Sequence, residues 1–195
     1  MISQNTFNLI KAKYGYWASW AVWAEEGETP KSNIGDLSIF DTDDVLSVLN
    51  PNVIFVGLNI SRGAITTPLA NFHDKRSEAT DYKIRFGFKN TPYWGGYMTD
   101  IIKDYDELDS VKVTDFLKDN RDYELKNIKI FEQELKDLEC QNPTLIAFGG
   151  STHGILKRYF KKDFEIHAVT HYAHFLGKEK YRAEILKKLN LDKNA

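Results

Sequence analysis

The sequence predicts a single α/β domain, a three-layer α/β/α sandwich with a mainly parallel central sheet of about four strands. Three observations predict this fold class. Continuous apolar runs bounded by proline or glycine are typical of strands that are buried on both faces. Helical segments with one apolar face alternate with these runs, which favours right-handed crossovers. The 195 residues contain no repeat and no Pro/Gly-rich linker, so we expect one domain spanning residues 1–195.

Four segments have the pattern of buried parallel strands. The clearest begins at Asn52, directly after Asn50-Pro51, and ends at Gly57. The third lies between Pro143 and a pair of glycines, which frame it as a strand. The four predicted strands are residues 52–57, 96–102, 144–148 and 164–170.

Apolar residues at helical spacing predict four helices around these strands. We expect Asp41 or Thr42 to cap the first and Ser151 to cap the third, and the fourth to run from Gly177 to Leu189. The buried positions expected in the four helices are Val45, Leu46 and Leu49; Leu125, Ile128, Phe131, Leu135 and Leu138; Ile155, Leu156 and Tyr159; and Tyr181, Ile185 and Leu189.

The segment from Tyr14 to Trp23 carries aromatic residues at Tyr16, Trp20 and Trp23. This spacing of four and three residues matches one face of a helix. It predicts an N-terminal aromatic helix that packs onto the sheet.

Composition excludes several classes of protein. The only cysteine, Cys140, excludes a disulfide, a cysteine-based zinc site and an iron–sulfur cluster within one chain, and it suits a reducing cytoplasm. No apolar run approaches the ~20 residues of a membrane helix, and the N-terminal residues lack the pattern of a signal peptide. A net charge of −2 does not indicate a nucleic-acid binder, although a basic patch on an acidic body stays possible. Aromatic residues, at 13%, serve either the core or base stacking, with the core favoured.

Ligands of open parallel sheets bind at the carboxyl ends of the strands, so the residues there are the candidates for function. Gly57 allows a ligand to approach the backbone closely, and Asn59 either orients a water molecule or caps the turn. Asp100 offers a carboxylate that acts as a base or as an acceptor, or else caps a helix or turn. The glycines at 149 and 150, followed by Ser151, form either an anion site at a helix N-terminus or a close turn.

Histidines follow the last predicted strand. His171 stands just past that strand, where its ring would touch a ligand. His167 and His171 share a face of a strand, but they would lie roughly 13 Å apart, too far for one ion. His174 joins them only if the segment is helical, and Ala168-Val169-Thr170 favours a strand. We therefore expect no metal site.

These pieces, in this order, resemble the uracil-DNA glycosylase superfamily. Gly57-Leu58-Asn59-Ile60-Ser61 is similar to the motif that follows the first sheet strand in its asparagine-bearing branches. Thr170-His171-Tyr172-Ala173-His174 is similar to the second motif, typically His-Pro-Ser. Phe72 stands where the superfamily often has its base-stacking aromatic residue. Asp100, within Thr99 to Lys103, stands where several branches have the base-reading asparagine of Thr-Asn-x-x-Lys.

The resemblance implies a DNA glycosylase that hydrolyses the N-glycosidic bond of a damaged or modified base, without a cofactor. Asn59 and His171 would be catalytic: Asn59 would position the attacking water, and His171 would stabilise the charge that develops on the departing base. Phe72 would stack on a base flipped out of the duplex. The resemblance places six residues around the substrate: Gly57, Leu58, Ile60, Phe72, Asp100 and Tyr172.

The sequence departs from the superfamily at three of these positions. Ile60 replaces a proline, Tyr172 with Ala173 replaces Pro-Ser, and Asp100 replaces the base-reading asparagine. A carboxylate only accepts hydrogen bonds, so it favours a base edge rich in N–H groups. These changes leave open a base other than uracil, a nucleotide ligand, or a protein that binds without catalysis.

The expected partner is DNA, or a nucleotide or base ligand, and not a membrane; we expect a monomer. Two segments rich in lysine and arginine would hold phosphates or form ordinary solvated helix faces. A third possibility for function is an unrelated small-molecule hydrolase in which Asp100 and His171 act as acid and base. The basic residues are Lys157, Arg158, Lys161, Lys162, Lys178, Lys180, Arg182, Lys187 and Lys188.

Overall fold

The computed structural model describes residues 2–42, 44–61, 63 and 65–192. Within these residues a central sheet of five strands has the order β1-β3-β2-β4-β5. β1 runs antiparallel to β3, and the other neighbours are parallel. The strands are β1 (Ala18–Trp20), β2 (Asn50–Asn59), β3 (Gly96–Ile102), β4 (Thr144–Phe148) and β5 (Ile166–Val169).

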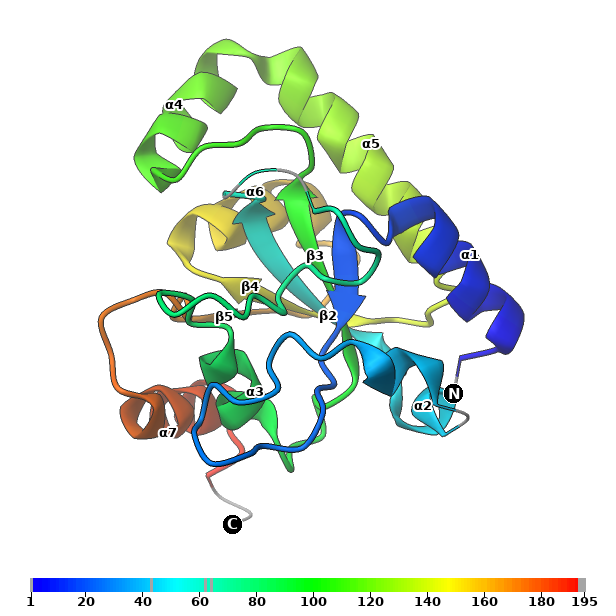
Figure 1. Cartoon of the computed structure of the whole chain (residues 1–195). Coiled ribbons are helices and arrows are strands. Elements are labelled where there is room, and N and C mark those ends of the chain that lie inside the picture. The colour runs from blue at the N-terminus through cyan, green and yellow to red at the C-terminus, as the bar shows by residue number, and fades with distance from the viewer. Residues whose placement is uncertain (1, 43, 62, 64, 193–195) are drawn as a thin grey trace.

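Helices cover both faces of the sheet, which confirms the three-layer α/β/α fold. α5 and α6 lie on one face, with α1 and α4 packed beside α5, and α3 and α7 lie on the other (Figure 1). The helices are α1 (Gln4–Tyr14), the 3-10 turn η1 (Ser38–Asp41), α2 (Val45–Val48), α3 (Tyr82–Phe88), α4 (Ser110–Asp119), α5 (Arg121–Asp137), α6 (Gly150–Phe160) and α7 (Lys178–Lys188).

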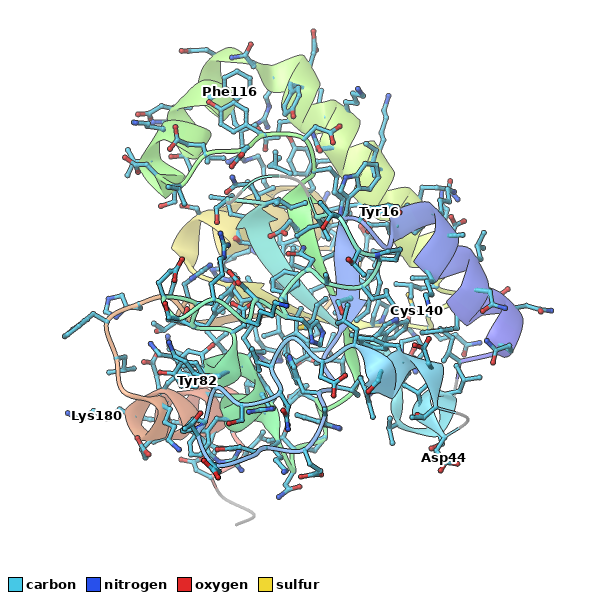
Figure 2. All side chains as sticks on the ribbon, viewed as in Figure 1. Tyr16, Asp44, Tyr82, Phe116, Cys140 and Lys180 are labelled. Carbon is cyan, nitrogen blue, oxygen red and sulfur yellow. The ribbon has the colours of Figure 1, made fainter. Side chains whose placement is uncertain are left out.

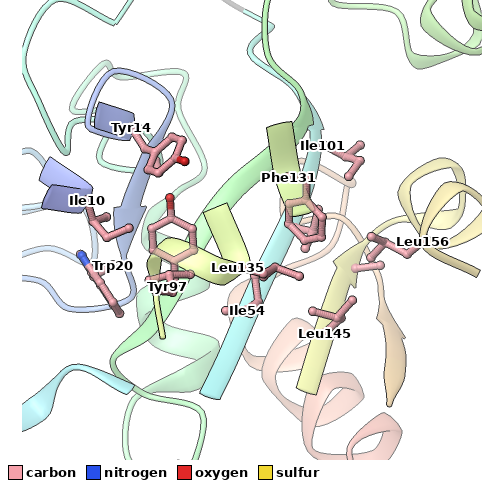
Figure 3. Packing of buried hydrophobic residues seen from close by; sticks show 14 of the residues in the cluster. Ile10, Tyr14, Trp20, Ile54, Tyr97, Ile101, Phe131, Leu135, Leu145 and Leu156 are labelled. Carbon is pink, nitrogen blue, oxygen red and sulfur yellow. The ribbon is translucent and has the colours of Figure 1, made fainter. Parts of the chain in front are cut away.

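Each face of the sheet has its own hydrophobic core, because successive side chains of a strand point to opposite faces. Ile54, Tyr97 and Leu145 pack toward α5 and α6, where they meet Phe131 and Leu156 (Figure 3). On the other face the sheet residues pack against α3 and α7: Phe55, Met98, Ile146, Phe148 and Val169. Burial on both faces explains why the strands read as continuous apolar runs.

The four predicted strands are confirmed, with small changes at their ends. β3 and β4 have the predicted bounds. β5 is shorter than predicted, and β2 is longer, so that Asn59 is its last residue. This extension matters for the site, since it fixes the backbone of Asn59 by pairing with Ile102 of β3.

The predicted aromatic helix from Tyr14 to Trp23 is wrong. The N-terminal helix, α1, ends at Tyr14, and residues 18–20 form strand β1 at the edge of the sheet. Trp20 is fully buried and packs edge-on against Tyr97 at 5.2 Å, whereas Tyr16 is half exposed. Pairing with β3 therefore outweighs the helical spacing of the aromatic rings, and α1 instead buries Phe7, Ile10 and Tyr14 at helical spacing.

Both predicted helix caps and one predicted core position are also wrong. Asp41 lies inside η1, and Thr42 donates its hydroxyl to Ile39 O at 2.9 Å instead of capping α2. Ser151 lies inside α6, whose N-cap is Gly149 in the left-handed region at φ +91°. Leu125 faces solvent on α5, because the buried face of that helix is centred on Ile128 and Phe131.

A buried ion pair joins α5 to the end of β3. Lys103 Nζ lies 2.6 Å from Glu134 Oε2, and both side chains are fully buried. The hydroxyls of Tyr97 and Thr99 each donate to Glu134 Oε1 at 2.9 Å. Asn127 of α5 accepts the backbone N–H of Lys103 at 2.8 Å. The carboxylate and the ammonium are therefore desolvated but paired with each other, which is the condition for two buried charges to persist.

Among the described residues, none of the helices has the length and apolar character needed to cross a bilayer.

We expect Lys103→Met to destabilise the fold by about 3–5 kcal/mol, because it leaves the Glu134 carboxylate buried without a counter-ion. The double variant Lys103→Met/Glu134→Gln removes both charges and keeps an oxygen acceptor for Tyr97 and Thr99, so it should recover most of that loss. Urea denaturation followed by circular dichroism measures both free energies of unfolding. A double variant that is no more stable than the single one would contradict this account.

Candidate active site

The candidate site is a cleft at the carboxyl ends of β2 and β4, with a volume of about 1150 Å³. From β2 the chain continues to β3 on one side of β2 and later to β4 on the other side. The topological switch point of the sheet therefore lies between β2 and β4. Seven of the eight predicted site residues line this cleft: Leu58, Asn59, Ile60, Phe72, Asp100, His171 and Tyr172. The eighth, Gly57, lies directly beneath the Asp100 carboxyl.

Asn59 is held in one orientation by the loop that follows β3. Its Nδ2 donates to Tyr105 O and to Glu107 O, both at 2.8 Å. Because both partners are carbonyl oxygens, the nitrogen and oxygen of this amide can be told apart. Both amide hydrogens are used, so the free function of the side chain is acceptance at Oδ1. An acceptor fixed in direction is suited to orient a water molecule.

His171 lies in the loop after β5 with its imidazole half-buried. Its Nδ1 accepts the backbone N–H of Ala173 at 3.1 Å, which leaves the proton of the neutral ring on Nε2. Burial lowers the pKa of His171 to about 4, so the ring is neutral near pH 7. Its ring stacks on that of Tyr172 with centroids 4.3 Å apart. The arrangement supplies one N–H donor on a positioned, uncharged ring.

Aromatic side chains form one wall of the cleft. Phe72 is 4% exposed, and its ring lies 6.3 Å from those of Phe148 and Tyr172. The backbone of Phe72 adopts φ +65°, a left-handed conformation that is costly for a bulky residue. Strained backbone of this kind concentrates at ligand sites. Of these three rings, Tyr172 is the one that is partly exposed to a ligand, and Phe72 and Phe148 support it from behind.

Asp100 lies inside β3, two residues before its carboxyl end, within the predicted strand 96–102. It is paired with Gly57 of β2, and its carboxyl leans over that glycine. A Cβ at Gly57 would be 2.1 Å from Asp100 Oδ1, so any other residue there would displace the carboxyl. Burial raises the pKa of Asp100 to about 6, against the opposing effect of Asn71, whose Nδ2 donates to Oδ2 at 2.9 Å.

The N-terminus of α6 also borders the cleft, as the glycine pair predicts. Gly149, Gly150 and Ser151 line it, and Gly149 packs beside the Cβ of His171. The first N–H groups of a helix have no partner within the helix and attract negative charge. This end of the cleft therefore favours an anionic group near His171.

The three histidines do not form a metal site. His167 lies on β5 and contacts Glu165 at 3.0 Å, whereas His171 faces the cleft and His174 is exposed. No group of three ligating side chains suitable for a metal ion occurs within the described ranges.

The basic segments on α6 and α7 are partly committed to the fold. Arg158 pairs with the buried Glu124 at 2.7 Å, and Lys188 pairs with Glu184 at 2.6 Å. Arg182 donates to three carbonyls at the end of α3: Phe86 O, Gly87 O and Lys89 O. Lys180 is exposed on the outer side of α7 (Figure 2). The other exposed lysines of the set, besides Lys188, are Lys157, Lys161, Lys162 and Lys187.

Three residues of the cleft were not predicted from the sequence. Asn71 orients Asp100, and its one sequence signal is that it precedes the candidate stacking residue Phe72. His73 is 3% exposed between the rings of Trp23 and Phe40, and burial lowers its pKa to about 4. Arg76, at the rim, forms a forked pair with Asp74. These three come from a long loop without regular spacing, so no periodic pattern marks them.

Comparison of the chain with family models, with curated proteins and with solved structures finds no match.

The raised pKa of Asp100 predicts a pH dependence of stability. The folded state holds this proton more tightly than the unfolded chain, whose aspartate has a pKa of 3.8, so stability is lost as the pH rises from about 4 to about 6. Asp100→Asn removes the effect. The stability of this variant relative to the wild type should therefore rise by about 3 kcal/mol across that interval. Denaturation at pH 4, 5, 6 and 7 measures the free energy of unfolding of both proteins. A difference between them that does not change with pH would contradict the raised pKa of Asp100.

The hydrogen bond from Ala173 to Nδ1 predicts the tautomer of His171 in solution. Long-range ¹H–¹⁵N spectra should show the neutral ring with its proton on Nε2 down to pH 5, because Nδ1 accepts from Ala173 and burial opposes the charge. A histidine in a model peptide is mostly charged at that pH, since its pKa is about 6.5. His171→Gln identifies the signal by its loss. A proton on Nδ1, or titration near pH 6.5, would contradict the described geometry.

Proposed function

We propose that this chain is a divergent DNA glycosylase of the uracil-DNA glycosylase-like superfamily, which hydrolyses the N-glycosidic bond of a damaged or modified base. One observation carries the proposal: a single aromatic-walled cleft holds the fixed acceptor of Asn59, the neutral N–H donor of His171 and the ring of Phe72. These are the groups that the reaction needs. They lie at the edge of the sheet where ligands of such folds bind.

The chemistry follows from these groups. As the N-glycosidic bond breaks, its electron pair leaves with the base, and the sugar becomes an oxocarbenium-like cation. Asn59 Oδ1 accepts a hydrogen bond from water and directs the water oxygen toward the sugar carbon. His171 donates Nε2–H to a base oxygen on which negative charge develops. The water oxygen bonds to the sugar, and the proton that the water loses finally neutralises the base anion.

A neutral His171 is suited to this role. The donor is already in place before the reaction, so its stabilising effect needs no reorganisation at the transition state. The N-terminus of α6, beside His171, adds favourable potential for the same charge. A metal ion is not required for either contribution.

One surface feature near the cleft supports DNA as the substrate. Phe175 is fully exposed in the loop that also carries His171 and Tyr172. Apolar side chains of this kind insert between base steps in proteins that distort DNA. The exposed lysines Lys157, Lys161 and Lys162 lie toward and beyond the carboxyl end of α6, away from the cleft that its amino end borders, so they do not add to this support.

A second candidate function is binding of a nucleotide or nucleic acid without catalysis. It is favoured by Ile60, Tyr172 and Asp100, which replace the residues that the superfamily has in its motifs. We also propose a cytoplasmic location, for which the support is Cys140 as the only cysteine.

Excision assays on duplexes with single modified bases test the proposal. We expect His171→Ala and Asn59→Ala each to lower the single-turnover rate by about 10²–10³, because each removes a group that acts near the transition state. DNA binding should stay near the wild-type level and weaken with added salt. Lys129→Ala, on the exposed side of α5, is the matched control and should keep the full rate.

The panel contains uracil, hypoxanthine, xanthine, 8-oxoguanine and 3-methyladenine opposite each normal base. Release of none of these bases by the wild type, together with retained DNA or nucleotide binding, would favour the binding-only function. Unchanged excision by both alanine variants would contradict the assigned roles.

A further inference from the structure

The floor of the cleft is a buried carboxyl beside an aromatic ring. Asp100 is 4% exposed, and its Oδ1 lies above the backbone of Gly57. The ring tip of Phe72, at Cζ, reaches the same glycine, 3.4 Å from the position a Cβ would take. A planar ligand that reaches the tip of the Phe72 ring in the cleft would therefore bring its edge to the carboxyl.

Asn71 fixes the direction of this carboxyl. Its Nδ2 donates to Trp17 O at 2.7 Å and to Asp100 Oδ2 at 2.9 Å, which uses both amide hydrogens. An ionised carboxylate has about four acceptor positions. Asn71 occupies one of them, so the carboxylate keeps acceptor capacity on both oxygens.

We propose that Asp100, oriented by Asn71, selects a base with two neighbouring N–H donors, the ring N–H and the exocyclic amine of guanine and its derivatives, and rejects uracil. Two parallel N–H···O bonds match the two carboxylate oxygens in spacing and polarity. The corresponding edge of uracil presents carbonyl oxygens on either side of its N–H, and these would face the carboxylate. The inference rests on the proposed function only in treating the cleft as the base pocket.

The protonation of Asp100 ties this selection to pH. Burial raises the pKa of the carboxyl to about 6. At pH 7.5 it is therefore ionised, and its two oxygens can accept the two hydrogen bonds of the base. Lys103 at the end of β3 lowers that pKa and Glu134 of α5 raises it. The histidines of the cleft, His73 and His171, are neutral above pH about 4 and add no competing charge. Guanine-type binding should therefore weaken as the pH falls through 6.

Calorimetry with nucleosides tests the inference without any chemical step. The probes are 2′-deoxyguanosine, 2′-deoxyinosine, which lacks only the exocyclic amine, and 2′-deoxyuridine. At pH 7.5 the wild type should bind deoxyguanosine at least about tenfold more tightly than deoxyinosine, because one hydrogen bond to a charged group is lost. At pH 5 its affinity for deoxyguanosine should drop about tenfold, as about nine-tenths of the carboxyl is then protonated.

Asp100→Asn should lose the preference for deoxyguanosine and gain deoxyuridine binding, because an amide has both a donor and an acceptor. Asp119→Asn, the same change on the exposed end of α4, is the matched control and should keep the wild-type preference. Wild-type binding of deoxyuridine as tight as that of deoxyguanosine would overturn the inference. So would the absence of any base preference with both nucleosides and DNA.

Thymine nonamers with one central guanine, hypoxanthine or uracil distinguish the source of the ligand. Tighter binding of the guanine nonamer than of deoxyguanosine indicates a base within DNA, and equal binding indicates a free nucleoside or nucleotide; the inference holds in both cases. A guanine preference without excision of any base contradicts the proposed catalysis and leaves the inference standing. Excision of uracil in preference to every guanine derivative supports the proposed catalysis and overturns the inference about guanine.

Discussion

The buried pair of Lys103 and Glu134 is the interaction on which the geometry of the cleft depends. It lies behind β3, on the face that packs against α5, together with Thr99. Asp100 follows Thr99 directly, so its side chain points to the opposite face, toward the cleft. The register that the ion pair imposes on β3 thus also sets the height of Asp100 above Gly57. A shift of one residue would exchange these faces, bringing the carboxyl into the apolar core and the threonine into the cleft.

The fold was predictable where burial dominates. Strands such as β2 and β4 are covered on both faces, and their continuous apolar sequences leave few alternatives. β1 was not predictable in this way. Its three residues are all buried, so they show no alternation of apolar and polar side chains, and the strand is too short to form a recognisable apolar run. The rings of Tyr16 and Trp20 happened to have helical spacing, and only the pairing of β1 with β3 decides between the two structures. Helix starts failed for a related reason: Ser151 has a good capping side chain, but Gly149 adopts a backbone conformation that serine rarely takes.

The cleft was predictable to the extent that strand ends define it. Asn59 and His171 follow from their places at β2 and β5, and Asp100 from its place in β3. Asn71 and His73 lie in the long connection between β2 and α3, whose path depends on tertiary contacts. Nor could the sequence show that Arg158 and Arg182 serve the fold, since a basic helix face reads the same whether or not its charges are paired. Charge patterns alone therefore overstated the surface available to phosphates.

Asn59 donates both hydrogen bonds of its side-chain amide to the main chain of the loop after β3, at the carbonyls of Tyr105 and Glu107. Every residue type provides such a carbonyl. The loop can therefore change its side chains, including Leu108 at the mouth of the cleft, while the amide keeps its orientation. Natural variation of this loop would alter what enters the cleft without disturbing the orientation of the Asn59 amide, which we propose as the acceptor for the water. The architecture separates a part of the protein that is free to diversify from a part that is not.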